Sequence, residues 1–210
     1  MVAASRNAES SEDLRRLKVE HGGRLSVHRV DVGDKASRRE FFDAVSREVG
    51  GLDLLINAAG IISGDEENIS TFGYLDQGEL SRTLLINSIA PLMMTEGAFP
   101  LLKKGTRPVV VNISSLNGSI SLWNRPGKYS YCASKAALNM ITKTLSVELR
   151  DAGILVVSFH PGWVKTWMTR NEDAPMEPAE SVGGMMRVIE SLGPEDSGKF
   201  LDWQGKEVPW

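Results

Sequence analysis

Residues 52–60 read LDLLINAAG, and this stretch decides the fold. It is a continuous apolar run that ends in small residues and a glycine. Such a run is typical of a strand that is buried on both faces of a parallel sheet. Its small carboxyl end predicts a tight turn that is open to a ligand. We therefore expect the sheet of an α/β protein, with helices on both faces.

The chain on both sides of this run alternates between strand patterns and helix patterns. Pro91 interrupts one of the helices and predicts a kink there. Because apolar strands alternate with helices, the sequence predicts an α/β fold with a doubly wound parallel sheet in three α/β/α layers. Further strands are predicted at residues 1–7, 24–32, 108–115, 154–162 and 198–205, and helices at residues 10–23, 34–51, 76–104, 131–150 and 178–192.

Composition limits the classes of protein and of partner. The 210 residues predict one domain, with the 41% apolar and 24% charged residues of an ordinary soluble globular protein. The net charge of −3 offers no basic surface to nucleic acid or to a membrane, and no apolar run approaches the ~18 residues of a membrane span. The single cysteine, Cys132, excludes an internal disulfide, and no Cys or His cluster has metal-ligand spacing. We expect a cytoplasmic protein without a metal.

Polar residues stand at the carboxyl ends of the predicted strands, at Arg6, Asp31, Asn57, Ser115 and His160. In a doubly wound sheet, ligands bind outside these ends. The sequence therefore predicts one site that takes residues from several strands. Within it, His160 fits a packed residue at a strand end better than a catalyst.

Tyr131 and Lys135 are four residues apart in a predicted helix, so both side chains lie on one face. A free tyrosine ionises near pH ~10, and a nearby ammonium would stabilise its phenolate. Ser115 ends a strand and can bring a hydroxyl to the same place, with Ser114 as the alternative. Together the three side chains predict proton transfer to or from an alcohol or carbonyl oxygen. A tyrosine and a lysine at this spacing alone would more often form a solvated face.

Five motifs occur in one order: NAAG at 57–60, Asn87, NISS at 112–115, YCASK at 131–135 and PGWVKT at 161–166. In this order and approximate spacing they resemble the short-chain dehydrogenase/reductase family. Within the family, the segments SSLNGSISLWNRPGKYSYCASKAALN and GKFLDWQGKEVPW resemble the subgroup of C-factor and sniffer-type carbonyl reductases. The resemblance spans essentially the whole chain and implies a single Rossmann-like domain over residues 1–210.

The resemblance implies an NAD(P)-dependent oxidoreductase that interconverts a carbonyl and a secondary alcohol on a small molecule. Tyr131 would be the general acid/base, Lys135 would lower its pKa and hold the nicotinamide ribose, and Ser115 would orient the substrate oxygen. Asn87 would hold a water in a proton relay. Its alternative role is that of a helix-interior asparagine that bonds the backbone near Pro91.

The same resemblance implies contacts with a dinucleotide. Arg6 matches a basic residue that receives the 2′-phosphate of NADP, which favours NADP(H), with NAD(H) as the alternative. An exposed arginine near the first residue also needs no ligand to explain it. The implied cofactor-binding residues are Arg6, Asp31, Val32, Asn57, Ala58, Ala59, Gly60, Tyr131, Lys135, Pro161, Gly162, Val164 and Thr166.

One departure from the family concerns its first strand and the Gly-rich turn T-G-x-x-x-G-x-G, which binds the pyrophosphate. The sequence has no counterpart of this turn, of the first strand or of the first helix, so the domain is N-terminally truncated relative to the family. The absent strand would be central, so we expect unpaired backbone groups in the middle of the sheet. A second function therefore stays open: a catalytically inactive protein, derived from the family, that acts through protein contacts or signalling and binds cofactor weakly or not at all.

The resemblance also implies a homodimer formed through the helices at residues 76–104 and 131–150. Trp163 and Trp167 follow the motif at 161–166, and a mobile substrate lid is one hypothesis for them. The choice of substrate would depend on the loops around Asp65, Trp123 and Met168.

Overall fold

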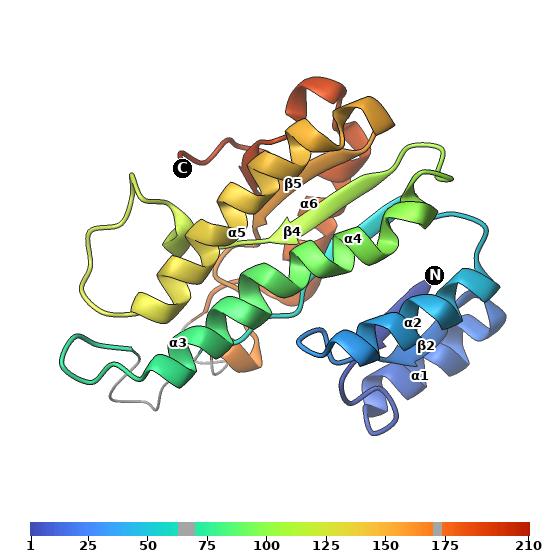
Figure 1. Cartoon of the computed structure of the whole chain (residues 1–210), viewed down its shortest axis with the longest axis horizontal. Helices are drawn as coiled ribbons and strands as arrows, with labels where there is room; N and C mark the ends of the chain where they lie inside the picture. The colour runs from blue at the N-terminus through green and yellow to red at the C-terminus, as the bar shows by residue number, and fades with distance from the viewer. Residues whose placement is uncertain (63–69, 170–173) are drawn as a thin grey trace.

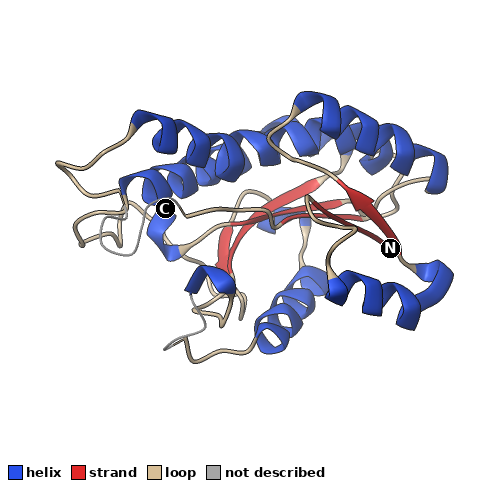
Figure 2. Ribbon diagram, turned by 90° about the horizontal axis from the view of Figure 1, so that it is seen from below, coloured by secondary structure: helices blue, strands red, loops and turns tan. Residues whose placement is uncertain are grey.

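The computed structural model of the chain describes residues 1–62, 70–169 and 174–210. Its strands form a middle layer, and helices cover both faces of that layer (Figure 2). Every pairing between named strands is parallel. The fold is the predicted Rossmann-like α/β/α arrangement. The predicted loop around Asp65 lies outside the described residues.

The strands form two parallel sheets in place of one. No pairing joins β1 to β3 within the part of the chain that is described, which confirms the expected unpaired backbone in the middle of the fold. The smaller sheet contains β1 (Val2–Ser5) and β2 (Ser26–Arg29). The larger sheet has the order β3 (Leu54–Asn57), β4 (Val109–Ile113), β5 (Leu155–His160) and β6 (Phe200–Asp202).

The larger sheet buries side chains on both faces, as its continuous apolar strands predict. On one face, Val111 belongs to a core with helix α6 (Pro178–Ser191). On the other face, Val110 belongs to a core with α4 (Ala90–Leu102) and α5 (Tyr129–Glu148). Successive residues of β4 thus contact opposite helix layers, which fixes the register of the strand.

Two helices accompany the smaller sheet (Figure 1). Helix α2 (Lys35–Glu48) places Phe41 and Val45 in one core with Met94 of α4, so it holds the smaller sheet to the larger one. Helix α1 (Glu12–His21) has no buried residue. The smaller sheet is therefore anchored to the rest of the fold mainly through α2.

One long helix spans residues 77–102 and has a break in its middle. Helix α3 (Gln77–Leu84) leads into a π-helical turn (Leu85–Ile89), and α4 follows directly. Pro91 lies in the first turn of α4, so the predicted kink coincides with the π-helical turn just before it. By length and composition alone this helix is apolar enough to cross a membrane, but the core helix of an α/β domain has the same features. The expected lack of a membrane partner stays a prediction.

Candidate active site

Ser115, Tyr131 and Lys135 come together beyond the carboxyl end of β4, as the sequence predicts. Helix α5 begins at Tyr129, so Tyr131 lies within its first turn and does not open it. Both Tyr131 and Lys135 are buried, with exposed fractions of 9% and 4%. The Nζ atom of Lys135 lies 5.6 Å from the centroid of the Tyr131 ring. It donates a hydrogen bond to the carbonyl oxygen of Ile113 at 2.8 Å.

Burial controls the ionisation of both side chains. Burial raises the pKa of Tyr131, and a hydrogen bond with Ser115 offsets part of this rise. Burial lowers the pKa of Lys135 to about 8. Removal of the phenol from water has the largest effect on this pKa, and a lowering of it by Lys135 stays a prediction. The site therefore holds a neutral phenol beside a hydroxyl, which is suited to donating a proton.

Asn87 is fully buried in the π-helical turn of the long helix. Its Oδ1 accepts a hydrogen bond from the Ile61 N–H at 2.8 Å. Its Nδ2 donates to the Ile61 carbonyl at 2.8 Å and to Ser134 Oγ at 3.0 Å. The side chain bonds the loop after β3 and not the backbone near Pro91, which was the alternative role. Asn87 thus fixes this loop, and a water held by it stays a prediction.

Gly60 lies close to Asn87 and Lys135. A Cβ atom at this position would lie 3.5 Å from Asn87 Oδ1 and 3.7 Å from Lys135 Nζ. It would lie 3.9 Å from the terminal methyl of Met168. Asn87, Lys135 and Met168 therefore face one point from three elements, and a turn that is open to a ligand stays a prediction.

Asn57 turns its side chain into the fold. Its Nδ2 donates to Asn112 Oδ1 at 2.9 Å, and Asn112 Nδ2 donates to Thr142 Oγ1 at 2.9 Å. Thr142 Oγ1 also shares a hydrogen bond of 2.8 Å with Ser158 Oγ. This buried network ties β3, β4, α5 and β5 together, so the side chain of Asn57 is a structural element. Contact of Asn57 with a cofactor stays a prediction. Asn112 and Thr142 were not predicted, although an asparagine inside an apolar strand is a signal for such a network.

Ser114 is not the site hydroxyl, because it is buried and bonded elsewhere. Its Oγ donates to Asn139 Oδ1 at 2.6 Å, and Asn139 Nδ2 donates to the Gly118 carbonyl at 3.2 Å. Farther along the same loop, Ser119 Oγ donates to the Pro209 carbonyl at 2.6 Å. The loop that connects β4 to α5 is therefore fixed at both of these points.

The other residues predicted to bind cofactor lie at the carboxyl ends of the strands. Arg6 is exposed just beyond β1. Asp31 Oδ1 accepts a hydrogen bond from the Gly33 N–H at 2.9 Å and shapes the turn after β2. Gly162 has a φ of +90°, and a Cβ there would lie 2.9 Å from Met176, so this turn requires glycine. Val32 and Pro161 are half-buried, Ala58, Ala59 and Thr166 are exposed, and Val164 is buried.

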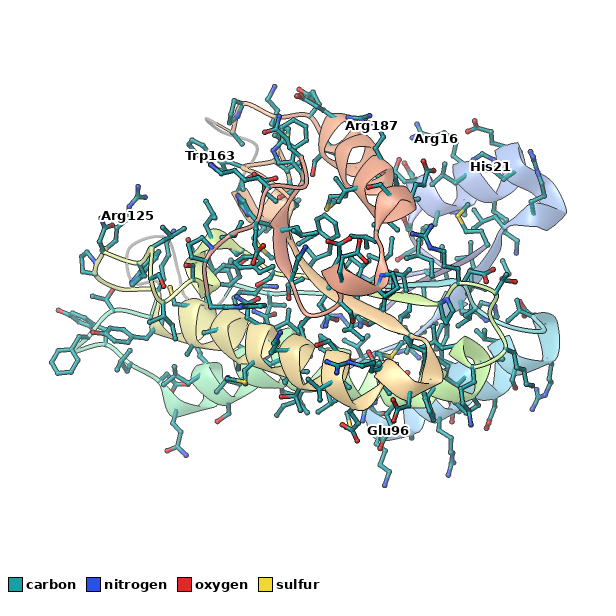
Figure 3. All side chains as sticks on the ribbon, turned by 90° about the horizontal axis from the view of Figure 1, so that it is seen from above. Arg16, His21, Glu96, Arg125, Trp163 and Arg187 are labelled. Atoms are coloured by element: carbon teal, nitrogen blue, oxygen red, sulfur yellow. The ribbon has the colours of Figure 1, made fainter. Side chains whose placement is uncertain are left out.

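Several other side chains at the ends of the sheet do not join the group formed by Ser115, Tyr131 and Lys135. His160 at the end of β5 has a buried Nδ1 with no hydrogen-bond partner, and burial lowers its pKa while Asp202 partly offsets that shift. This agrees with its predicted packing role. Trp163 and Trp167 are 57% and 91% exposed, and Trp163 lies at the opposite end of the molecule from His21 (Figure 3). A lid formed by these tryptophans stays a prediction.

Comparison with known proteins assigns the chain to a family. The sequence matches the short chain dehydrogenase family over residues 1–177. It is 43% identical over 161 residues to the C-signal of Myxococcus xanthus, which covers 77% of this chain and 94% of that protein. The structure is similar to the NADPH-bound carbonyl reductase from chicken fatty liver (TM-score 0.89, 35% identity) and to the carbonyl reductase Sniffer of D. melanogaster (TM-score 0.93, 31% identity). Both matches cover 100% of this chain and 87% of the other. The chain therefore belongs to the short-chain dehydrogenase family of oxidoreductases and has the fold of its sniffer-type carbonyl reductases.

Proposed function

We propose that the chain is an NADP(H)-dependent oxidoreductase that interconverts a carbonyl and a secondary alcohol on a small molecule. The observation that carries this proposal is the buried Tyr131 phenol, which is held beside the Ser115 hydroxyl and on the same helix face as Lys135. The 35% identity with an NADPH-bound carbonyl reductase supports it.

In the proposed reaction, Tyr131 gives its proton to the substrate oxygen during reduction and takes it back during oxidation. Ser115 orients that oxygen. The raised pKa of Tyr131 keeps the phenol protonated at neutral pH, which favours reduction. Lys135, with a pKa of about 8, is mostly cationic at neutral pH and stabilises the negative charge that develops on the oxygen.

The residues at this edge of the sheet fit a dinucleotide. Ala58 and Ala59 are exposed and small, and Gly60 lies close to Lys135. Lys135 would hold the nicotinamide ribose. Arg6 would receive the 2′-phosphate, because a guanidinium matches the geometry of a phosphate. When bound, the cofactor supplies the hydride for the carbonyl carbon.

The test is NADPH oxidation with a panel of small aldehydes and ketones. Tyr131→Phe removes the proton donor and keeps the ring, so turnover should fall by about 100-fold or more. Tyr129→Phe is the matched control. Tyr129 lies on the same helix turn as Tyr131 but is 46% exposed, so this variant should keep full turnover. Undiminished turnover in the folded Tyr131→Phe variant would sink the assignment.

A second candidate is a catalytically inactive protein that acts in signalling or through protein contacts. The 43% identity to a protein named C-signal favours it. Calorimetric titration of the folded chain with NADPH separates the two candidates. Saturable binding supports the oxidoreductase, whereas its absence, together with no turnover, supports the second candidate.

We also propose a homodimer formed through α3–α4 and α5, in the cytoplasm. These helices carry exposed apolar side chains, with Ile89 46%, Met140 67% and Val147 57% exposed. Sedimentation should show a dimer that Met140→Glu and Val147→Glu together convert to monomer, whereas Val19→Glu on α1 should not. Cell fractionation tests the proposed cytoplasmic location. This proposal rests on the single cysteine, Cys132, which excludes an internal disulfide.

A further inference from the structure

Helix α5, which carries the candidate acid/base, begins differently from the first three α-helices of the chain. At the start of α1, α2 and α3, the side chains of Ser11, Asp34 and Asp76 each accept a hydrogen bond from a main-chain N–H of the first turn. At α5 this position holds Lys128, which has a φ of +56° and makes no capping side-chain hydrogen bond within the described residues. A lysine side chain has donors only, so it cannot accept from an N–H group. The start of α5 therefore needs an acceptor from elsewhere.

Ser70 supplies this acceptor from the loop that precedes α3, 60 positions before Ser130 (Figure 1). The Ser70 Oγ accepts a hydrogen bond from the Ser130 N–H at 3.0 Å. The Ser70 carbonyl accepts a hydrogen bond from the Tyr129 N–H at 3.2 Å. These N–H groups belong to the first turn of α5, where a helix has no acceptors of its own for them. Ser70 is 4% exposed and thus caps α5 from a buried position.

The backbone of Ser70 indicates what its hydroxyl contributes. Its φ is +47°, in the left-handed region that glycine adopts more easily than serine. Such a conformation is unfavourable for serine and persists only where surrounding contacts hold it. Compared with glycine, serine adds one buried acceptor for the helix at this position. The hydroxyl and the carbonyl of one strained residue are thus both directed at the start of α5.

Tyr131 depends on this cap because it lies in the first turn of α5. The Cys132 N–H donates to the Lys128 carbonyl at 2.8 Å, so the hydrogen bonds within the helix start one residue after Tyr131. The two residues just before Tyr131 are the ones whose N–H groups Ser70 accepts. Fraying of this turn would move the Tyr131 phenol away from Ser115, with which it shares a hydrogen bond.

We infer that Ser70 is a positioning residue for the candidate acid/base: its hydroxyl and carbonyl hold the first turn of α5 and thereby keep the Tyr131 phenol in place beside Ser115. The inference rests on the proposed function for the role of Tyr131, whereas the cap itself does not. It predicts that the loss of one hydroxyl outside the group of Ser115, Tyr131 and Lys135 slows turnover.

Ser70→Gly removes the Oγ atom and keeps both the carbonyl and the left-handed backbone. It leaves the buried Ser130 N–H without its acceptor, so kcat should fall by about threefold to tenfold while KM for NADPH stays the same. Glycine also relieves the backbone strain, so the variant should stay folded. Ser70→Asn tolerates a positive φ and offers a side-chain oxygen, so it should recover most of the lost kcat. A purely structural role of Ser70 would change the melting temperature and not the kcat of the folded chain.

Amide hydrogen exchange tests the cap without substrate or cofactor. The Ser130 amide should exchange about threefold to tenfold faster in Ser70→Gly than in the unaltered chain. Ser130→Ala is the matched control, because the Ser130 Oγ is buried without a hydrogen-bond partner among the described residues and its N–H group stays. This control should keep both kcat and the slow exchange of the first turn.

Two outcomes separate the inference from the proposed function. Equal kcat and equal exchange rates in Ser70→Gly and Ser130→Ala would overturn the inference and leave the proposed function standing. An unaltered chain that reduces no carbonyl would contradict the proposed function and, with it, the role of Ser70 in turnover. Faster exchange in Ser70→Gly would in that case still support the cap.

Discussion

Lys135 and Tyr131 share one face of α5, with Nζ 5.6 Å from the ring centroid, yet the hydrogen bond of Lys135 goes to the Ile113 carbonyl. The ammonium is therefore anchored to the end of β4. This hydrogen bond holds the ammonium of Lys135 close to the Tyr131 phenol. Its distance from the phenol is set jointly by α5 and β4.

Lys135 should give the folding stability a distinct pH dependence. Its folded pKa of about 8 lies below the unfolded value of 10.5, so between these values the unfolded chain binds a proton that the folded chain does not. The Lys135 contribution to stability therefore rises as the pH increases from about 8 to 10.5. Lys135→Met should remove this rise in urea unfolding curves, whereas Met in place of the exposed Lys143 should keep it. The same slope in both variants would contradict the buried-lysine account.

Ionisation of Lys135 should also set the alkaline limb of the pH profile of turnover. If the cationic form of Lys135 supports the reaction, kcat/KM falls as the pH rises through about 8. Lys135→Arg keeps the charge at higher pH and should shift this limb upward. A profile that does not move between the two proteins would assign the limb to another group.

The two adjacent serines should behave in opposite ways. Ser115→Ala should lower kcat by about tenfold to 100-fold with little change in stability, because its hydroxyl faces the Tyr131 phenol. Ser114→Ala leaves the Oδ1 atom of the buried Asn139 without its donor and should cost about 1–3 kcal/mol of unfolding free energy. Steady-state kinetics and urea unfolding on both variants check this, and a reversed pattern would make Ser114 the site hydroxyl.

Gly118 should be sensitive to a single methyl group. A Cβ there would lie 2.8 Å from the backbone carbon of Lys135, so Gly118→Ala should push on this turn of α5. We expect a loss of about 1–3 kcal/mol of stability together with lower turnover. Gly50→Ala is the control, since nothing lies within 4 Å of its added methyl. Comparable melting temperatures for the two variants would count against this close contact.

The network around Asn112 should be a stability element. Asn112→Ala removes one buried hydrogen bond from Asn57 and one from Thr142, which should cost about 2 kcal/mol or more. Asn124→Ala, at an exposed position, should have a small effect. Chemical denaturation at neutral pH measures both, and an effect on Asn112→Ala as small as that of the control would argue against the network.

Local sequence was enough to predict the elements and the proximity of Tyr131 and Lys135 in the candidate site. The apolar run at 52–60 predicts β3, and the spacing of Tyr131 and Lys135 survives in the fold because a helix fixes it. The direction of Asn57 could not be predicted, because its partner Asn112 is 55 positions away. The pKa of Tyr131 is likewise a property of burial, which depends on tertiary packing and not on the neighbouring cation alone.

Unpaired backbone groups in the middle of the fold were expected, whereas two separate sheets were not. The expectation of unpaired backbone followed from the absence of one strand. That Phe41 and Met94 keep the smaller sheet attached across the gap required the positions of α2 and α4, which no local pattern supplies.

The π-helical turn at residues 85–89 makes the length of its helix matter as much as its composition. Each residue of an α-helix advances the side-chain direction by about 100°, so the wider turn changes the angular phase of α3 relative to α4. This change of phase allows one continuous helix to pack its α3 segment against α5 and its α4 segment against β3. A substitution at an exposed position leaves the phase unchanged, whereas loss of one residue from the turn would rotate α3 and carry Asn87 away from Ile61. Natural variation within this helix should therefore consist of exchanges of residues and not of insertions or deletions.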